Sequence, residues 1–294
     1  EDVGYNGKAK ELMRIGVDVL PRIPKDSTDR NRTSPFAFTG NKFEFRMLGS
    51  NASVSDANTV LNTAVAQELG KFADILEASG NFKVDLHNIV METVRKHKRI
   101  LFSGNGYDQS WVKEAEERGL SNLRTTPDAL AHLLDEKNVK LLTENRVLSE
   151  SELHSRYEIM LENYCKVIAI EALTMIQMTR ASILPAVTKF RRYLADTLLS
   201  VKAADENADL TYEKEQISKL STLSSIIYRD VEILEKALAA AKTAENTKAS
   251  AAAFRDSVIP AMSELRIVAD ETETIMAKDF WPYPGYGEIL FGVR

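Results

Sequence analysis

A short run of alternating charged and apolar residues has the spacing best suited to chemistry. The run reads Lys42-Phe43-Glu44-Phe45-Arg46-Met47. Because successive side chains of a strand point to opposite faces, this period predicts a half-buried strand with its charged side chains on one face. A carboxylate between two cations can hold a metal ion while a neighbouring guanidinium binds an anion. The alternative, more common by spacing alone, is a solvent-exposed face with weak salt bridges.

A second candidate lies ten to twelve residues before the first residue of that strand. Arg30 and Arg32 flank Asn31 in a polar segment that ends at Pro35. The composition predicts an ordered loop. Two arginines in a short loop can clamp a phosphate or a carboxylate, although surface loops also collect arginines without a binding role.

The loop and the strand together match the sequence pattern of a known enzyme family. The segment Asn31-Arg32-Thr33-Ser34-Pro35, followed closely by Lys42-Phe43-Glu44-Phe45-Arg46, resembles the glutamine synthetase pattern of an Asn-Arg-Ser/Thr loop before an Arg-x-Glu-x-Arg strand. The wording DRNRTSPFAFTGNKFEFRMLGS resembles the type III glutamine synthetases in particular. The C-terminal FWPYPGYGEILF is similar to the end of that form. The resemblance therefore touches both ends of the chain, and type III enzymes also carry a long helical C-terminal region.

The resemblance implies roles for four residues. Glu44 falls on the strand glutamate that ligates divalent metals. Arg46 falls on the arginine that binds glutamate and the γ-phosphoryl group, and Arg32 on the loop arginine that contacts the nucleotide phosphate and the transferring phosphoryl group. Lys42 replaces an arginine that reaches the nucleotide phosphates in shorter relatives, so the charge is kept but the bidentate fork is lost. The implied cofactors are ATP and Mg²⁺ or Mn²⁺.

Part of the family's site is not recognisable in this chain. The next family arginine would fall on Ala37, so no residue is assigned to that role. One carboxylate cannot hold the two or three metals of the family, and its other ligands and ammonium-binding acid precede this region. We therefore expect a fragment, inactive alone, in which glutamate and ammonia are substrates only of the longer protein.

The remaining pattern is helical. A helix is expected at Lys8–Val17, and Phe36-Ala37-Phe38 is expected to pair with the strand as a hairpin. Helices are predicted over 57–78, 84–98, 108–118, 128–135, 150–204, 211–243 and 247–278. Within them, Ser149 and Glu152 predict a capping box, and Pro185 should kink or split its helix.

The predicted fold class is α+β and predominantly α: short antiparallel strands from a glutamine-synthetase-type catalytic sheet, then a bundle of long helices. Residues 1–140 are assigned to the C-terminal part of the catalytic domain and 141–279 to the bundle extension. Residues 280–294 are assigned to an aromatic, proline-rich tail that packs on the body, and residues 280–287 within it are expected not to be helical.

The amino-acid composition argues against several classes of protein. The 294 residues are 44% hydrophobic and 28% charged, with a net charge of −5, which argues against a general nucleic-acid binder. No stretch approaches about 20 consecutive apolar residues, so no membrane span is expected. The single cysteine, Cys165, is expected to pack in the core and fits a reducing, cytoplasmic location.

Two other functions stay open. A non-enzymatic helical interaction or assembly module would leave the charged strand as mere surface. Another carboxylate–amine ligase, such as a glutamate–cysteine ligase, would use similar chemistry, although the amino-acid sequence of the loop and the strand argues against it. The resemblance itself implies a homododecamer of two rings in the full-length form.

Overall fold

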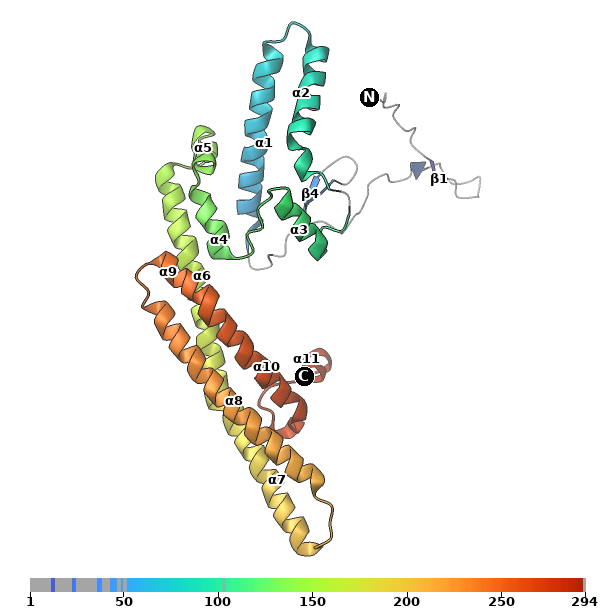
Figure 1. Ribbon diagram of the computed structural model, residues 1–294, viewed down its shortest axis with the longest axis vertical. Helices are drawn as coiled ribbons and strands as arrows, with labels where there is room; N and C mark the ends of the chain where they lie inside the picture. Colours follow the sequence, from blue (N-terminus) through green and yellow to red (C-terminus); the bar gives the residue numbers. More distant parts are fainter. Residues whose placement is uncertain are drawn as a thin grey trace. The chain divides into compact units, whose positions relative to one another are not determined.

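The computed structural model describes residues 43–46, 49, 52–102 and 104–292, together with the backbone of three short strands before them. It divides into two compact units, residues 1–122 and 123–294. Helices dominate both units (Figure 1), which confirms the predominantly α class. The division follows Asn122, whereas the sequence placed a boundary at 140.

The strands of the first unit form two hairpins. Strand β1 (Leu12–Met13) pairs antiparallel with β2 (Ile23–Pro24), and β3 (Phe36–Phe38) pairs antiparallel with β4 (Phe43–Phe45). The second pairing confirms the predicted hairpin. The helix predicted over Lys8–Val17 is wrong at Leu12 and Met13, because their backbone pairs with a second strand instead. Among the strands that the structure describes, each sheet has two, so these hairpins do not establish a larger catalytic sheet.

Two antiparallel helices follow. Helix α1 (Val54–Glu77) begins at the N-cap Ser53, and α2 (Phe82–His97) begins at the N-cap Asn81, each with a side-chain oxygen that accepts a helix N–H. Thr63 and Ile89 are the only buried side chains among the described residues of this unit. Most apolar side chains of helices α1 and α2, Val60 and Leu69 among them, are thus exposed to solvent.

Aromatic stacking fixes the end of the first unit. A 3₁₀ turn (Lys98–Ile100) leads to α3 (Gln109–Glu117), which Asp108 caps. The rings of Phe102 and Trp111 stack with centroids 3.9 Å apart, and the Arg118 guanidinium lies 5.2 Å from the Trp111 ring. Arg118 also donates to the Leu101 carbonyl at 2.8 Å, so α3 is held against the segment before it.

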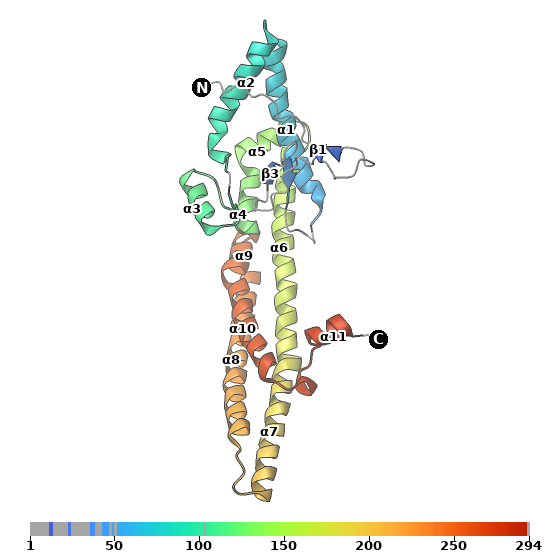
Figure 2. The same cartoon turned by 90° about the vertical axis from the view of Figure 1, so that its right-hand side faces the viewer.

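The second unit is a helical bundle. Helix α4 (Thr126–Ala131) is followed by a 3₁₀ turn (His132–Leu134) and by α5 (Glu136–Glu144). The long helices come next: α6 (Glu150–Met178), α7 (Leu184–Ala204), α8 (Thr211–Lys242), α9 (Thr247–Ala253) and α10 (Ile259–Ile275). Ser149 and Glu152 form the predicted capping box of α6. Figure 2 shows α6 and α7 as one nearly straight rod beside α8.

Each proline of the long helices follows a π-helical turn. Residues Thr179–Ile183 form such a turn before Pro185, and Phe254–Val258 form another before Pro260. Proline donates no hydrogen bond, and its ring clashes with the carbonyl four residues earlier in a regular α-helix. The wider turn relieves both problems, so the helix is interrupted as predicted at Pro185 yet continues in the same direction.

Helix α8 contributes a continuous row of buried apolar side chains to the middle of the core, here called the α8 seam. Its buried side chains recur three or four residues apart, as in Leu220, Leu223, Ile227, Val231 and Leu234. They pack with Val187 and other residues of α7, and with residues of α10. Cys165 packs on this core as predicted, and its partial burial raises the pKa of the thiol.

The C-terminal segment packs on the same core only in part. Phe280 ends a 3₁₀ turn (Lys278–Phe280) and lies 5.0 Å from Phe190 and 5.3 Å from Tyr193, centroid to centroid. Trp281 and Tyr283 also pack on the core. The predicted absence of helix over 280–287 is wrong at Tyr286 and Gly287, because these residues begin α11 (Tyr286–Phe291). The apolar side chains of α11 are exposed.

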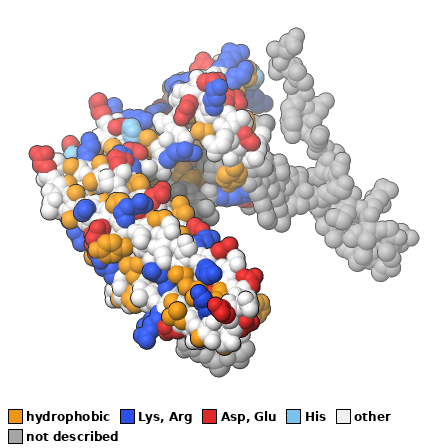
Figure 3. Space-filling view, turned by 60° about the horizontal axis from the view of Figure 1, so that its bottom comes forward, with side chains coloured by type: hydrophobic (Ala, Val, Ile, Leu, Met, Phe, Trp, Pro, Cys, Tyr) orange, Lys and Arg blue, Asp and Glu red, His pale blue; other side chains and the backbone are white. Residues whose placement is uncertain are grey.

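The surface of the described residues mixes all types of side chain. Figure 3 shows acidic, basic and apolar side chains interspersed on one face. Among the described residues, the run Glu150–Ala204 is long and apolar enough to span a membrane by length and composition alone. The same run gives Leu161 and Ile168 to the core. The expected lack of a membrane partner stays a prediction.

The buried row of α8 predicts that isoleucine-to-alanine substitutions destabilise the fold strongly at a buried position of this helix and weakly at an exposed one. Ile227→Ala removes a fully buried side chain and should lower the free energy of unfolding by about 2–5 kcal/mol. Ile233→Ala on the same helix, where the side chain is 49% exposed, should change it by less than about 0.5 kcal/mol. Urea denaturation measures both, and equal losses would contradict the assigned seam.

An ion pair between the π-helical turn after α6 and helix α8 predicts a pH effect. Arg180 donates to both carboxylate oxygens of Glu235 at 2.6 Å, and these bonds lower the pKa of Glu235 from its usual 4.5. A lowered pKa stabilises the fold above pH 4.5, and this contribution disappears as the pH falls through the lowered value. Since both side chains are partly exposed, the contribution should be at most about 1 kcal/mol.

Glu235→Gln should therefore reduce stability at about pH 7 but not at about pH 2–3, as measured by thermal unfolding across that range. Glu158→Gln serves as the control, because the Glu158 side chain forms no ion pair within the described residues. A loss of stability in Glu235→Gln that does not vary with pH would contradict the ion-pair account.

Candidate functional site

The backbone pairing of β3 and β4 places the candidate site. Glu44 lies opposite Ala37 in the hairpin, between the Phe36–Phe45 and Phe38–Phe43 pairs. Arg46 follows the strand by one residue, and its side chain reaches Glu44. Both side chains are half-buried, at 35% exposed for Glu44 and 29% for Arg46.

Glu44 and Arg46 form a close ion pair. Arg46 donates to Glu44 Oε2 through Nη2 at 2.8 Å and through Nε at 3.2 Å. Hydrogen bonds between a guanidinium and a carboxylate hold both groups in a fixed orientation. The predicted charged pair of the strand is therefore assembled, with the carboxylate and the cation in direct contact.

The aromatic residues of the strand depart from the prediction. Phe43 is 66% exposed and Phe45 is 43% exposed, so the predicted burial of this face is wrong. Alternation fixes which side chains share a face, but burial also requires a second layer to cover that face. A two-stranded hairpin supplies no such layer.

Two further candidate residues, Arg32 and Lys42, lie outside the described residues. Their implied contacts with phosphate stay predictions. Across the described part of the chain, no three His, Cys, Asp or Glu side chains are grouped closely enough to hold a metal ion. Glu44 supplies the hard oxygen ligand that Mg²⁺ or Mn²⁺ prefers, but one such ligand does not make a site.

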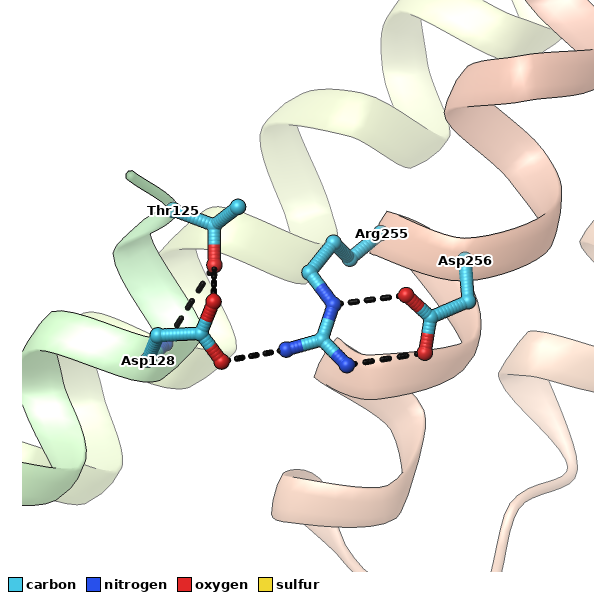
Figure 4. A network of polar contacts seen from close by, with 4 residues as sticks. All are labelled: Thr125, Asp128, Arg255 and Asp256. Atoms are coloured by element: carbon cyan, nitrogen blue, oxygen red, sulfur yellow. Dashed lines mark hydrogen bonds and ion pairs between the residues drawn. The ribbon is translucent and has the colours of Figure 1, made fainter. Parts of the chain in front are cut away.

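A polar network in the second unit was not found from the sequence (Figure 4). Arg255 donates to both oxygens of Asp256, at 2.6 and 2.8 Å, and through Nη1 to Asp128 at 2.5 Å. Thr125, the N-cap of α4, donates in turn to Asp128 at 2.5 Å. Asp256 and Asp128 raise the pKa of the Arg255 guanidinium, which therefore stays charged.

This network is structural. Every nitrogen of the guanidinium has a carboxylate partner, so the group is already fully engaged within the protein. The contacts tie the start of α4 to the π-helical turn before α10. Asp128 and Arg255 are 127 residues apart, and no local pattern signals such a pairing.

Comparisons with known proteins agree with the motifs. Residues 85–202 match the family described as the glutamine synthetase C-terminal domain. The chain is 40% identical to a type-3 glutamine synthetase of Dictyostelium discoideum over 95% of its length. It is 35% identical to a glutamine synthetase of Butyrivibrio fibrisolvens over 92% and 34% identical to one of Bacteroides fragilis over 96%.

These matches cover a minor part of each relative. The aligned regions are 39%, 39% and 40% of the length of the three relatives, in the same order. The resemblance to the type III glutamine synthetases is confirmed for nearly the whole of this chain, while the larger part of each relative has no counterpart in it.

Proposed function

We propose that this chain, whose residues 85–202 match the glutamine synthetase C-terminal domain, forms the C-terminal part of a type III glutamine synthetase. The observation that carries the proposal is the pair Glu44 and Arg46, set by the hairpin within a segment that resembles the family's metal- and substrate-binding strand. The similarity to a type-3 enzyme over 95% of the chain supports the same assignment.

The proposed reaction joins ammonia to glutamate at the expense of ATP. A carboxylate is a poor electrophile, so the γ-carboxylate first takes the terminal phosphoryl group of ATP, which leaves ADP. Ammonia then attacks the carbonyl carbon of the γ-glutamyl phosphate, the bond to phosphate breaks, and glutamine and inorganic phosphate leave. Both steps require cations around the phosphoryl oxygens.

The chain's own residues have distinct tasks in this scheme. Glu44 contributes a carboxylate ligand to the divalent metal, which neutralises phosphoryl charge when it is bound. Arg46 binds the substrate carboxylate and the transferring phosphoryl group, since its planar guanidinium suits both anions. Arg32 and Lys42 contact the nucleotide phosphates. The other metal ligands and the ammonium-binding acid come from the part of the enzyme that this chain does not contain.

The proposed quaternary structure and cellular location are those that the resemblance to the type III enzymes implies. A homododecamer of two rings, with active sites between subunits, is the proposed assembly, and the proposed location is the cytoplasm. The bundle of the second unit carries no motif for the reaction among its described residues, so we assign it to assembly or regulation rather than to the chemistry.

The role of Glu44 predicts a strong effect in the full-length enzyme. Glu44→Ala should lower metal-dependent glutamine formation at least about 100-fold, because a catalytic metal contributes several kcal/mol. Phosphate release with glutamate, ATP, ammonia and Mg²⁺ measures the rate. Glu68→Ala is a matched control, since Glu68 is likewise a glutamate in an ion pair, with Lys71 at 2.5 Å. Unchanged turnover in Glu44→Ala would favour the non-enzymatic module.

The incomplete ligand set predicts that the chain is inactive by itself. The purified 294-residue chain should release no phosphate above background in the same assay, whereas the full-length enzyme should be active. The reason is that a single carboxylate ligand does not hold the metals that phosphoryl transfer requires. Glutamine formation by the isolated chain would show that the missing ligands lie within it.

A further inference from the structure

An open cleft lies at the end of α10, where the chain turns back toward α11. It has a volume of about 660 Å³. Its walls come from Glu273 and Met276 at the end of α10, from Trp281 and Tyr283 in the connecting segment, and from Phe291 of α11. This volume lies within the range of small-molecule sites, about 300–1,000 Å³.

The aromatic walls are held in place by the core. Phe280 packs against Phe190 and Tyr193 of α7 and so anchors the connecting segment. Next to it, the rings of Trp281 and Tyr283 lie 6.3 Å apart at an angle of 73°. Two rings at this angle form a corner, and both pack partly on the core. The corner is therefore built before any ligand arrives.

The described residues that line the cleft include one cation, Lys278, and two carboxylates, Glu273 and Glu288. Lys278 lies 3.3 Å from Glu288, and Glu288 also accepts the Gly285 N–H at 3.0 Å. These contacts lower the pKa of Glu288, so the Lys278–Glu288 pair is internally neutral near neutral pH. Glu273 forms no side-chain hydrogen bond or ion pair within the described residues. Arg266, whose positive charge also interacts with Glu273, is itself paired with Asp270 at 2.9 Å. Among the described residues that line the cleft, the aromatic corner therefore faces a net negative charge.

We propose that this cleft binds a small organic cation, an alkylammonium or quaternary ammonium group. The cation sits against the faces of Trp281 and Tyr283, whose ring quadrupoles attract positive charge. Glu273 provides the counter-ion, and Met276 provides an apolar floor for the alkyl part of the ligand. The inference uses residues of the second unit alone and does not depend on the proposed synthetase function.

The test is a binding titration on the whole chain with choline as the probe. Trp111→Phe leaves Trp281 as the only tryptophan, because the chain contains two, and its fluorescence then reports the cleft. Choline should quench or shift this emission saturably. The neutral isostere 3,3-dimethyl-1-butanol should bind at least tenfold more weakly, because it has the same shape without the charge. Calorimetry on the unmodified chain checks the affinity.

Variants connect the binding to the named residues. Glu273→Gln should weaken choline binding at least fivefold, and Tyr283→Leu should do the same without loss of the circular dichroism of the fold. Glu264→Gln on the same helix should leave it unchanged. No saturation by choline, equal binding of the neutral isostere, preferential binding of ATP, or unchanged affinity in Glu273→Gln would each overturn the proposal.

Discussion

The second unit depends on one constraint, the continuous apolar seam of α8. Fully buried residues such as Leu220, Ile227 and Val231 must meet side chains from α7 and α10 along the helix. Pro185 and Pro260 lie in the helices that pack on this seam. A sharp kink at either proline would break the packing, whereas a π-helical turn keeps the direction of the helix and preserves the seam.

Polar contacts lie at the two π-helical turns. Arg180 follows the first residue of one turn and binds Glu235 of α8, and Arg255 has the same position in the other and binds Asp256 and Asp128. In each case the guanidinium meets a carboxylate with two hydrogen bonds. Bidentate pairs define orientation better than they add stability at a partly exposed site.

The sequence alone predicted the features that depend on local pattern. Apolar periodicity located the long helices to within a few residues, and the Ser149–Glu152 capping box and the β3–β4 pairing followed from local chemistry. The exposure of Phe43 was not predictable, because burial depends on whether another layer covers the strand. The pairing of Asp128 with Arg255 was equally hidden, because it joins elements distant in sequence. For the candidate site, the pattern indicated the charged pair of Glu44 and Arg46, but no further metal ligand among the described residues.

We propose that Glu44 belongs to a metal site in the full-length protein. The most direct measurement is a crystal structure of that protein grown with Mn²⁺ and a non-hydrolysable ATP analogue, with anomalous scattering used to place the metal. The account predicts an anomalous peak at coordination distance from the Glu44 carboxylate. Manganese bound elsewhere, with no metal at the Glu44 carboxylate, would contradict it.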